Sequence, residues 1–393
     1  MPDGTVPRLP TVWVFRCHRE GDHAQSLALA HALGWPFEVK ELRFHWWEIV
    51  PALADRVTLA GIDRRRSSPL VPPWPDLIIL AGRRNEIPAR WVRAQSGGRT
   101  RIVVMGRYWT PPDKLDLAVT TPQFRLPPHP NVLHNRLPLH LVDEKRLAEA
   151  RAVWTPRLDH LPRPRIAVLV GGSSGPYVFS RVTARRLGRE ASALARAQGG
   201  SLLVSTSART RLRAISALEA ALDVPRIFYR WRPGDPDNPY FGFLAVADAF
   251  IVTGDSMSML AEACSTGRPV HVFEFGSGPA AMRGPRSRSL PVRQWWRWSQ
   301  LRDQGVLGLP YALAIGLPAK RLNRSRDIRL AQEAVIAAGY ARWISDAEPP
   351  RAEPLPFDDL ARAVERVRAL FEGAGRYADG LPRGGLVPSE AAG

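Results

Sequence analysis

The stretch AFIVTGDSMSMLAEACSTGRPVHVFEF (249–275) shows the alternation on which the fold prediction depends. It begins with the apolar run AFIVT, typical of a buried strand, continues through a short helix near Met257–Thr266, and ends with the apolar run VHVFEF. Gly267 and Pro269 stand where such a helix ends. A strand, a helix and a strand in this order indicate a parallel sheet covered by helices.

The same alternation extends towards the N-terminus and divides the chain into two sets of elements. The second set has five strands and four helices between residues 165 and 275 and begins with RIAVLVGG (165–172). The first set has short apolar strands between residues 11 and 137 and an amphipathic helix, HAQSLALAHAL (23–33), closed by Gly34. We therefore predict an α/β protein with two Rossmann-like, doubly wound parallel-sheet domains that face a cleft.

Changes in composition suggest where the domains begin and end. We expect an N-terminal domain over residues 1–150 and, after a Pro-containing linker, a C-terminal domain over residues 163–345. Residues 276–320 of the latter are rich in Gly, Pro, Arg and Trp, and helical periodicity returns over residues 327–344. Residues 346–393 are expected to form one more helix and a flexible tail.

Composition excludes several classes of protein. Of the 393 residues, 45% are hydrophobic and 23% are charged, which are the proportions of a folded globular protein. No apolar run is long enough for a transmembrane helix and no signal-peptide pattern opens the chain, so we expect a cytoplasmic protein. Cys17 and Cys264 are too few for a disulfide framework and lack zinc-ligand spacing, so no metal is expected.

The net charge implies an anionic partner. The chain has 55 basic and 37 acidic residues, a formal net charge of +18, and nucleic acid, anionic lipid and nucleotide phosphate all suit arginine. The acid-free stretch 276–302 has six arginines beside Trp295, Trp296 and Trp298. This stretch either binds an anionic surface, with the protein peripheral at the inner membrane, or packs with its tryptophans buried. No RNP, KH, helix-turn-helix or zinc-finger pattern is present, so nucleic acid is not the expected partner.

Small and polar residues follow AFIVT, at the strand end where ligands of such folds bind. The loop and the start of the next helix contain Gly254, Asp255, Ser256 and Ser258. Free N–H groups at this helix start suit a diphosphate, and Glu262 is placed to accept hydrogen bonds from both hydroxyls of a ribose. The alternative is that Asp255 or Ser256 only caps the helix and Glu262 is a solvated helix residue.

Three further loops of the second domain hold candidate nucleotide-binding residues. The first is a Gly-rich loop after RIAVLV, which is either a second phosphate-binding nest or a tight turn. The second opens a helix after the strand SLLVST and either assists an anion site or caps that helix. The third precedes a short helix and forms either a turn and cap or contacts to a nucleobase. These residues are Gly171, Gly172, Ser173 and Ser174, then Arg209 and Thr210, then Asn238 and Tyr240.

Two loops of the first domain hold candidates for acid–base chemistry and acceptor binding. A base there would abstract a proton from an acceptor hydroxyl, while arginines after the strand LIIL would reach an anion. The alternative is that the histidines are ordinary surface residues and that Asp22 is an N-cap. The candidates are Asp22 and His23 as bases, with His18 nearby, and Gly21, Gln25, Arg83 and Arg84 for an acceptor or anion.

Several motifs in this order resemble the ELM-type mitochondrial fission protein family, including its bacterial members, over residues 11–275. The motifs are Gly21-Asp22-x-x-Gln25, Ala81-Gly82-Arg83-Arg84, Asn131-Val132, Val170-Gly171-Gly172, Ser207-x-Arg209-Thr210, Asn238-Pro239-Tyr240 and Val252-Thr253-Gly254-Asp255-Ser256-x-Ser258-Met259-x-x-Glu262-Ala263.

The resemblance implies a function, because this family is similar to the glycosyltransferase-B superfamily. That similarity implies a nucleotide sugar bound in the C-terminal domain, with a ribose-binding glutamate at the position of Glu262. We therefore hypothesise a glycosyltransferase-B-like, metal-independent enzyme without a cofactor, which transfers the sugar of a nucleotide-diphosphate sugar to an anionic or membrane-associated acceptor. Asp22 or His23 would be the base, and Arg83 or Arg209 would neutralise the departing diphosphate. The rival hypothesis is a non-catalytic nucleotide-binding scaffold that recruits proteins to a membrane.

Overall fold

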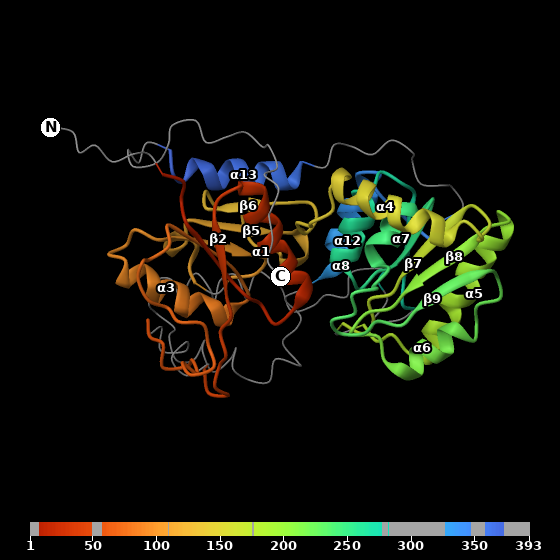
Figure 1. The fold of residues 1–393 in the computed structure, drawn as a ribbon, viewed down its shortest axis with the longest axis horizontal. Coiled ribbons are helices and arrows are strands. Elements are labelled where there is room, and N and C mark those ends of the chain that lie inside the picture. Colours follow the sequence, from red (N-terminus) through yellow and green to blue (C-terminus); the bar gives the residue numbers. More distant parts are fainter. Residues whose placement is uncertain are drawn as a thin grey trace. The chain divides into compact units, whose positions relative to one another are not determined.

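The chain folds into two α/β units, each built on its own six-stranded sheet (Figure 1). The computed structural model describes residues 8–48, 57–108, 110–174, 177–276, 282, 327–346 and 358–372. Unit 1 contains the described residues up to Leu139 and those from Asp358 onward, and unit 2 contains the described residues from His140 to 346. The predicted pair of parallel-sheet domains is confirmed, and the predicted cleft between them stays a prediction.

In unit 1, all the strand pairs are parallel and the order is β2-β1-β3-β4-β5-β6. The chain passes from β1 to β2 on one side and then to β3 on the other, so the order reverses between β1 and β3. Ligands of open α/β sheets bind at such a reversal, beyond the carboxyl ends of the strands. The strands are β1 (Val12–Phe15), β2 (Phe37–Lys40), β3 (Leu77–Ala81), β4 (Arg101–Met105), β5 (Leu117–Thr120) and β6 (Val132–His134).

Helices cover this sheet, and strands β1, β3 and β5 are buried along their whole length, as is typical of parallel sheets. The first helix ends at Gly34, whose φ of 70° is left-handed, so the predicted stop is confirmed. The helices are α1 (Glu20–Leu33), α3 (Glu86–Gln95) and α13 (Asp359–Ala369), with short 3-10 helices η1 (Arg83–Asn85), η2 (Pro112–Lys114) and η3 (Pro122–Phe124).

Helix α13 belongs to unit 1, although it follows unit 2 in the chain (Figure 1). The buried carboxylate of Asp359 accepts hydrogen bonds from the amides of Arg136 and Leu137, just after β6, at 3.0–3.1 Å. The ring of Phe371 packs edge-on against Trp35, with the centroids 5.1 Å apart. We expected residues 346–393 to form a separate C-terminal segment. That prediction is corrected, because the helix of this segment completes the first domain.

Unit 2 has the strand order β12-β11-β10-β7-β8-β9, again entirely parallel. Numbered from its own first strand, this is the 3-2-1-4-5-6 order of dinucleotide-binding folds, with its reversal between β7 and β10. The strands are β7 (Arg165–Leu169), β8 (Ser201–Ser205), β9 (Arg226–Tyr229), β10 (Ala249–Thr253), β11 (Val270–Phe273) and β12 (Arg342–Trp343).

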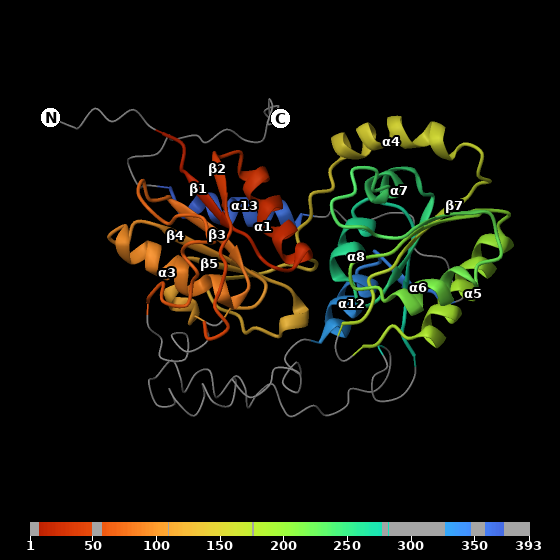
Figure 2. The same cartoon turned by 60° about the horizontal axis from the view of Figure 1, so that its bottom comes forward.

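The first helix of unit 2 corrects the boundary that we placed at residue 150. This helix packs against the helix that contains Gly242 (Figure 2). A Cβ on Gly242 would come within 2.2 Å of the indole of Trp154. This helix is therefore part of unit 2, which begins at His140. The helices are α4 (Glu144–Leu158), α5 (Arg181–Ala197), α6 (Leu212–Glu219), α7 (Tyr240–Val246), α8 (Met257–Cys264) and α12 (Ile328–Ala337).

The predicted helical stretch 327–344 is only partly helical. Helix α12 ends at Ala337, and Gly339, with a φ of 81°, turns the chain into strand β12 beside β11. The predicted membrane-binding stretch 276–302, with Trp295, Trp296 and Trp298, lies outside the described residues except for Gly276 and Met282. Within the part of the chain that is described, no helix is long and apolar enough to cross a membrane.

We expect Asp359→Ala to lower the free energy of unfolding by about 2 kcal/mol, because two buried amides lose their acceptor. Urea unfolding followed by tryptophan fluorescence measures this. The control is Asp358→Ala, since Asp358 is exposed and makes no capping hydrogen bond. Equal effects of the two substitutions would contradict the role given to Asp359.

Candidate functional site

The loops after β7 and β10 are joined by one hydroxyl group at the strand-order reversal of unit 2. Thr253, the last residue of β10, accepts a hydrogen bond from the amide of Gly171 at 2.8 Å. The same hydroxyl donates to Oδ1 of Asp255 at 2.8 Å. A single threonine therefore links two loops that are far apart in the sequence.

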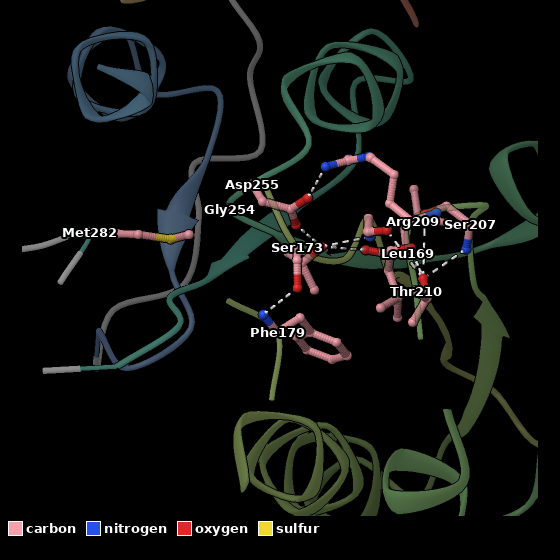
Figure 3. A network of polar contacts seen from close by, with 12 residues as sticks. Leu169, Ser173, Phe179, Ser207, Arg209, Thr210, Gly254, Asp255 and Met282 are labelled. Atoms are coloured by element: carbon pink, nitrogen blue, oxygen red, sulfur yellow. Dashed lines mark hydrogen bonds and ion pairs between the residues drawn. The ribbon is translucent and has the colours of Figure 1, made fainter. Parts of the chain in front are cut away.

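Asp255 in turn fastens the loop after β8 (Figure 3). Its Oδ2 lies 2.7 Å from Nη1 of Arg209, and its side chain is fully buried while that of Arg209 is 42% exposed. Burial raises the pKa of Asp255, and the charge of Arg209, the Thr253 hydroxyl and the Gly172 amide oppose that rise. A buried carboxylate needs such partners to remain charged. Asp255 is therefore not the helix cap that the sequence left open.

Two hydroxyl side chains complete the attachment of the loop after β8. The Thr210 hydroxyl accepts a hydrogen bond from the Ser207 amide at 3.0 Å and donates one to the carbonyl oxygen of Gly171 at 3.1 Å. The Ser207 hydroxyl donates to the same carbonyl oxygen. Thr210 thus holds the loop in place rather than facing outward to an anion.

Gly171 and Gly172 permit the loops to approach this closely. A Cβ on Gly171 would lie 2.5 Å from Oδ2 of Asp255. Gly172 has a φ of 125°, and a Cβ there would lie 2.4 Å from the carbonyl oxygen of Arg209. The Gly171 amide is already bonded to Thr253, so the glycines act by their lack of a side chain.

Ser173 and Ser174 support the tight-turn interpretation of the Gly-rich loop. The Ser173 hydroxyl accepts a hydrogen bond from the Phe179 amide at 3.0 Å (Figure 3). Ser174 and Tyr177 exchange two backbone hydrogen bonds of 2.9 Å. The turn is closed by its own contacts.

The start of α8 keeps the donors that an anion needs. Ser256 is the N-cap residue, and its side chain makes no capping hydrogen bond. Among the described residues, no partner is recorded for the amides of Met257 and Ser258, in the first turn. Buried Gln332 of α12 donates to the carbonyl oxygen of Gly254 at 2.5 Å and so supports the loop that enters the helix.

Glu262 is held by a tyrosine. The hydroxyl of Tyr240, at the start of α7, donates to Oε2 of Glu262, and the Asn238 side chain accepts from the Tyr240 amide at 3.0 Å, as a turn and cap. Burial raises the pKa of Glu262 to about 7, and the bond from Tyr240 opposes that rise. Glu262 is therefore not a solvated helix residue.

In unit 1, the loops after β1 and β3 are joined at the corresponding reversal. The buried Asn85 side chain donates to the carbonyl oxygens of Arg16 and Ala81, at 3.1 and 3.2 Å. Arg83 is half-buried, and the exposed Arg84 pairs with Glu48 at 2.7 Å. Both arginines follow β3, beside this reversal, and their predicted role in binding an anion stays a prediction.

The candidate bases of unit 1 differ sharply in exposure. His23 is only 4% exposed, so it is buried in α1, and that burial lowers its pKa. Asp22 lies within the first turn of α1 and is not its N-cap, which is Arg19. His18 is exposed, with Nδ1 3.9 Å from the Cys17 sulfur. Of His18 and His23, only His18 is exposed to an acceptor from solvent.

The other two unit 1 candidates lie at the start of α1. The Gln25 side chain donates to the carbonyl oxygen of Gly21 at 3.4 Å, so these residues contact each other within the helix.

Among the described residues, no group of three or more His, Cys, Asp or Glu side chains is placed to hold a metal ion.

Sequence reasoning missed three residues that organise these sites, namely Thr253, Gln332 and Asn85. Thr253 ends an apolar run, and that run predicts a strand residue rather than a contact between two loops. Gln332 and Asn85 lie on helices, where their sequence context gives no sign of a contact with a distant loop. The only usable signal was a hydroxyl residue directly before a Gly-Asp pair.

We expect Gly171→Ala to destabilise the protein by about 2 kcal/mol, because its Cβ would overlap the Asp255 carboxylate. Denaturant unfolding checks this. Asp255→Ala removes the same overlap, so the double variant should lose clearly less stability than the sum of the single variants. Strictly additive losses would show that the two residues do not meet.

We expect the stability of the protein to fall between about pH 5 and pH 7.5 because of Glu262. Its pKa rises on folding from 4.5 to about 7, so the folded state binds more protons across this window and loses that advantage as pH increases. Relative to Glu262→Gln, the wild type should lose about 2 kcal/mol across the window, measured by urea unfolding at each pH. Tyr240→Phe should move the fall to higher pH.

The matched control is Glu149→Gln, which removes an exposed carboxylate from α4 of the same unit. It should leave the pH profile unchanged. A wild-type profile parallel to that of Glu262→Gln would contradict the assignment.

Known proteins resemble this chain at two levels. The sequence profile of the family described as Mitochondrial fission ELM1 matches residues 20–289. Mitochondrial fission protein ELM1 of Arabidopsis thaliana is 32% identical over 182 residues, which are 44% of this chain and 42% of that protein. The uncharacterized protein RP120 of Rickettsia prowazekii is 23% identical over 292 residues, which are 67% of this chain and 82% of that protein. The match thus spans less than half of the Arabidopsis protein.

Among solved structures, a glycosyltransferase from Rickettsia africae has a TM-score of 0.42 and 10% identity, with 93% of this chain and 99% of that chain covered. The UDP-GlcNAc 2-epimerase of Methanocaldococcus jannaschii also has a TM-score of 0.42 and 10% identity, with 92% and 99% covered.

Proposed function

The chain belongs to the mitochondrial fission ELM1 family, and on that premise we propose that unit 2 binds a nucleoside-diphosphate sugar and that the protein transfers the sugar to an acceptor. One observation carries the proposal. The loops after β7, β8 and β10 are fastened together at the strand-order reversal of unit 2. Beside them is a helix start whose first amides have no hydrogen-bond partner among the described residues. This is where open α/β sheets bind nucleotides.

The diphosphate would lie at the start of α8. The amides of Met257 and Ser258 provide donors there, and the helix dipole favours an anion. Arg209 is half-exposed, and its guanidinium has five N–H groups, of which the ion pair with Asp255 occupies only some. The remaining N–H groups are available to a phosphate oxygen.

The ribose would bind the carboxylate of Glu262. One carboxylate has about four acceptor positions, and the Tyr240 hydroxyl occupies one of them. An ionised Glu262 could accept both ribose hydroxyls while Tyr240 keeps it oriented. Because the pKa of Glu262 is about 7, nucleotide binding should strengthen from pH 6 to pH 8.

His18 is the base that we propose in place of His23. It lies beyond the carboxyl end of β1, next to the reversal of unit 1. Partial loss of solvent contact, and then the charges of Arg19 and Arg84, lower the pKa of His18, which favours the neutral imidazole that can accept a proton. The net charge of +18 favours an anionic acceptor.

We expect nucleoside diphosphates or their sugars to raise the melting temperature, since a ligand that binds the folded state stabilises it. The probes are UDP, GDP, ADP, CDP and dTDP with their common sugar forms, at pH 6 and pH 8. Glu262→Ala and Arg209→Ala should each weaken binding about tenfold or more, and Glu149→Ala should not. The absence of any shift, or full binding by both site variants, would refute the nucleotide site.

Release of nucleoside diphosphate from the sugar nucleotide so identified separates the enzyme from the scaffold. His18→Gln should lower kcat by about a hundredfold and leave nucleotide affinity unchanged. Binding without release or sugar conversion by the wild type, with lipid-linked and polyanionic acceptors supplied, would favour a nucleotide-binding scaffold instead.

A further inference from the structure

Helices α5 and α6 begin side by side at the carboxyl end of the unit 2 sheet. They follow the neighbouring parallel strands β7 and β8, and they pack against each other along their length (Figures 1 and 2). Gly188, in the middle of α5, faces the end of α6, where a Cβ would come within 2.8 Å of the Ala221 Cβ. Gly188 and Ala221 each follow the start of their helix by roughly two turns, so the two helix starts lie at the same edge of the sheet.

Three aliphatic side chains protrude into solvent at these helix starts. Val178 and Val182 are 60% and 72% exposed, at the entry to α5, and Leu212 is 77% exposed, in the first turn of α6. Single exposed aliphatic residues are ordinary. These three stand at the entries of two adjacent helices, exposed to solvent and outside the core.

Exposed arginines neighbour these aliphatic residues in the sequence. Arg181 opens α5, and Arg211 and Arg213 flank Leu212 at the start of α6. Neither helix has an acidic residue in its first turn, and within the described part of the chain no ion pair is recorded for these three arginines. Cations at helix N-termini oppose the helix dipole, so their placement does not serve the stability of the helices.

We propose that this surface, the α5–α6 rim of Val178, Arg181, Val182, Arg211, Leu212 and Arg213, docks on an anionic phospholipid bilayer. Aliphatic tips enter the headgroup region while guanidinium groups bind lipid phosphates. Charge complementarity selects the occupant, because the rim is purely cationic. Three separate aliphatic tips suit shallow insertion, whereas a stable protein interface needs a continuous packed apolar core.

Docking through the rim has a consequence for the neighbouring loop. Arg209 and Thr210, in the loop that the Asp255 network holds, run directly into Arg211. A bilayer bound at the rim therefore lies beside that loop. The inference does not depend on nucleotide turnover, because vesicle binding can be measured without any nucleotide.

The test is co-sedimentation of the full chain with vesicles of phosphatidylcholine alone or with 30% phosphatidylglycerol, a mixture of about the anionic content that basic surfaces recognise. The wild type should bind only the anionic vesicles and should dissociate as salt increases. Replacing Arg181, Arg211 and Arg213 by Ser should reduce partitioning about a hundredfold, from roughly fivefold for each arginine near the surface. Replacing Val178, Val182 and Leu212 by Ser should reduce it about tenfold or more.

A site-specific probe locates the contact independently of binding strength. Both native cysteines are buried, so Leu212→Cys can carry an environment-sensitive fluorophore. Val153→Cys on α4 is the control, since Val153 is also an exposed aliphatic residue, at 52%. Only the probe at residue 212 should shift to the blue on anionic vesicles. The control for the charge series is Arg226→Ser, at the amino end of β9, where no effect is expected.

Three results would overturn the proposal. One is the failure of the wild type to bind anionic vesicles. Another is that the rim variants keep their melting temperatures and bind as strongly as the wild type, while substitution of Trp295, Trp296 and Trp298 abolishes binding. The last is an unshifted probe at residue 212 on vesicles that the protein does bind.

Discussion

The buried carboxylate of Asp255 is the constraint around which the candidate site of unit 2 is built. A charge enclosed in protein must be paired, and here Arg209, the Thr253 hydroxyl and the Gly172 amide supply the partners. They come from loops after three different strands, so the pairing brings those loops together. Gly171 must lack a side chain, because any Cβ would occupy the place of the carboxylate.

This arrangement changes which groups are free to bind a ligand. The Gly-rich loop resembles a phosphate nest in the sequence, but the amide of Gly171 is bonded to Thr253 and its carbonyl oxygen accepts from Ser207 and Thr210. Within the part of the chain that the structure describes, the donors without a partner lie instead at the start of α8 and on the exposed side of Arg209. Internal charge pairing thus orients the site, and an anion would meet it at the helix start.

The elements with strong local signals were predictable. Apolar runs marked most of the strands, and Gly34 marked the end of α1 because a left-handed residue there ends the helix. Strand β12 was not predictable, since two residues carry no periodicity and only pairing with β11 makes them a strand. The placement of α13 was equally hidden, because it depends on Asp359 reaching amides more than two hundred residues earlier in the chain.

Local periodicity in the sequence was enough to predict the class of fold, with two parallel-sheet domains. It was also enough to predict the strand ends at which candidate functional residues lie. The sequence placed Glu262 and Arg209 at candidate sites but left their roles open. The pairing of Asp255 with Arg209 and the hydrogen bond from Tyr240 to Glu262 became known from the folded structure. The same is true of the burial of His23 and the exposure of His18. These outcomes depend on burial and on contacts between distant segments, which no local pattern encodes.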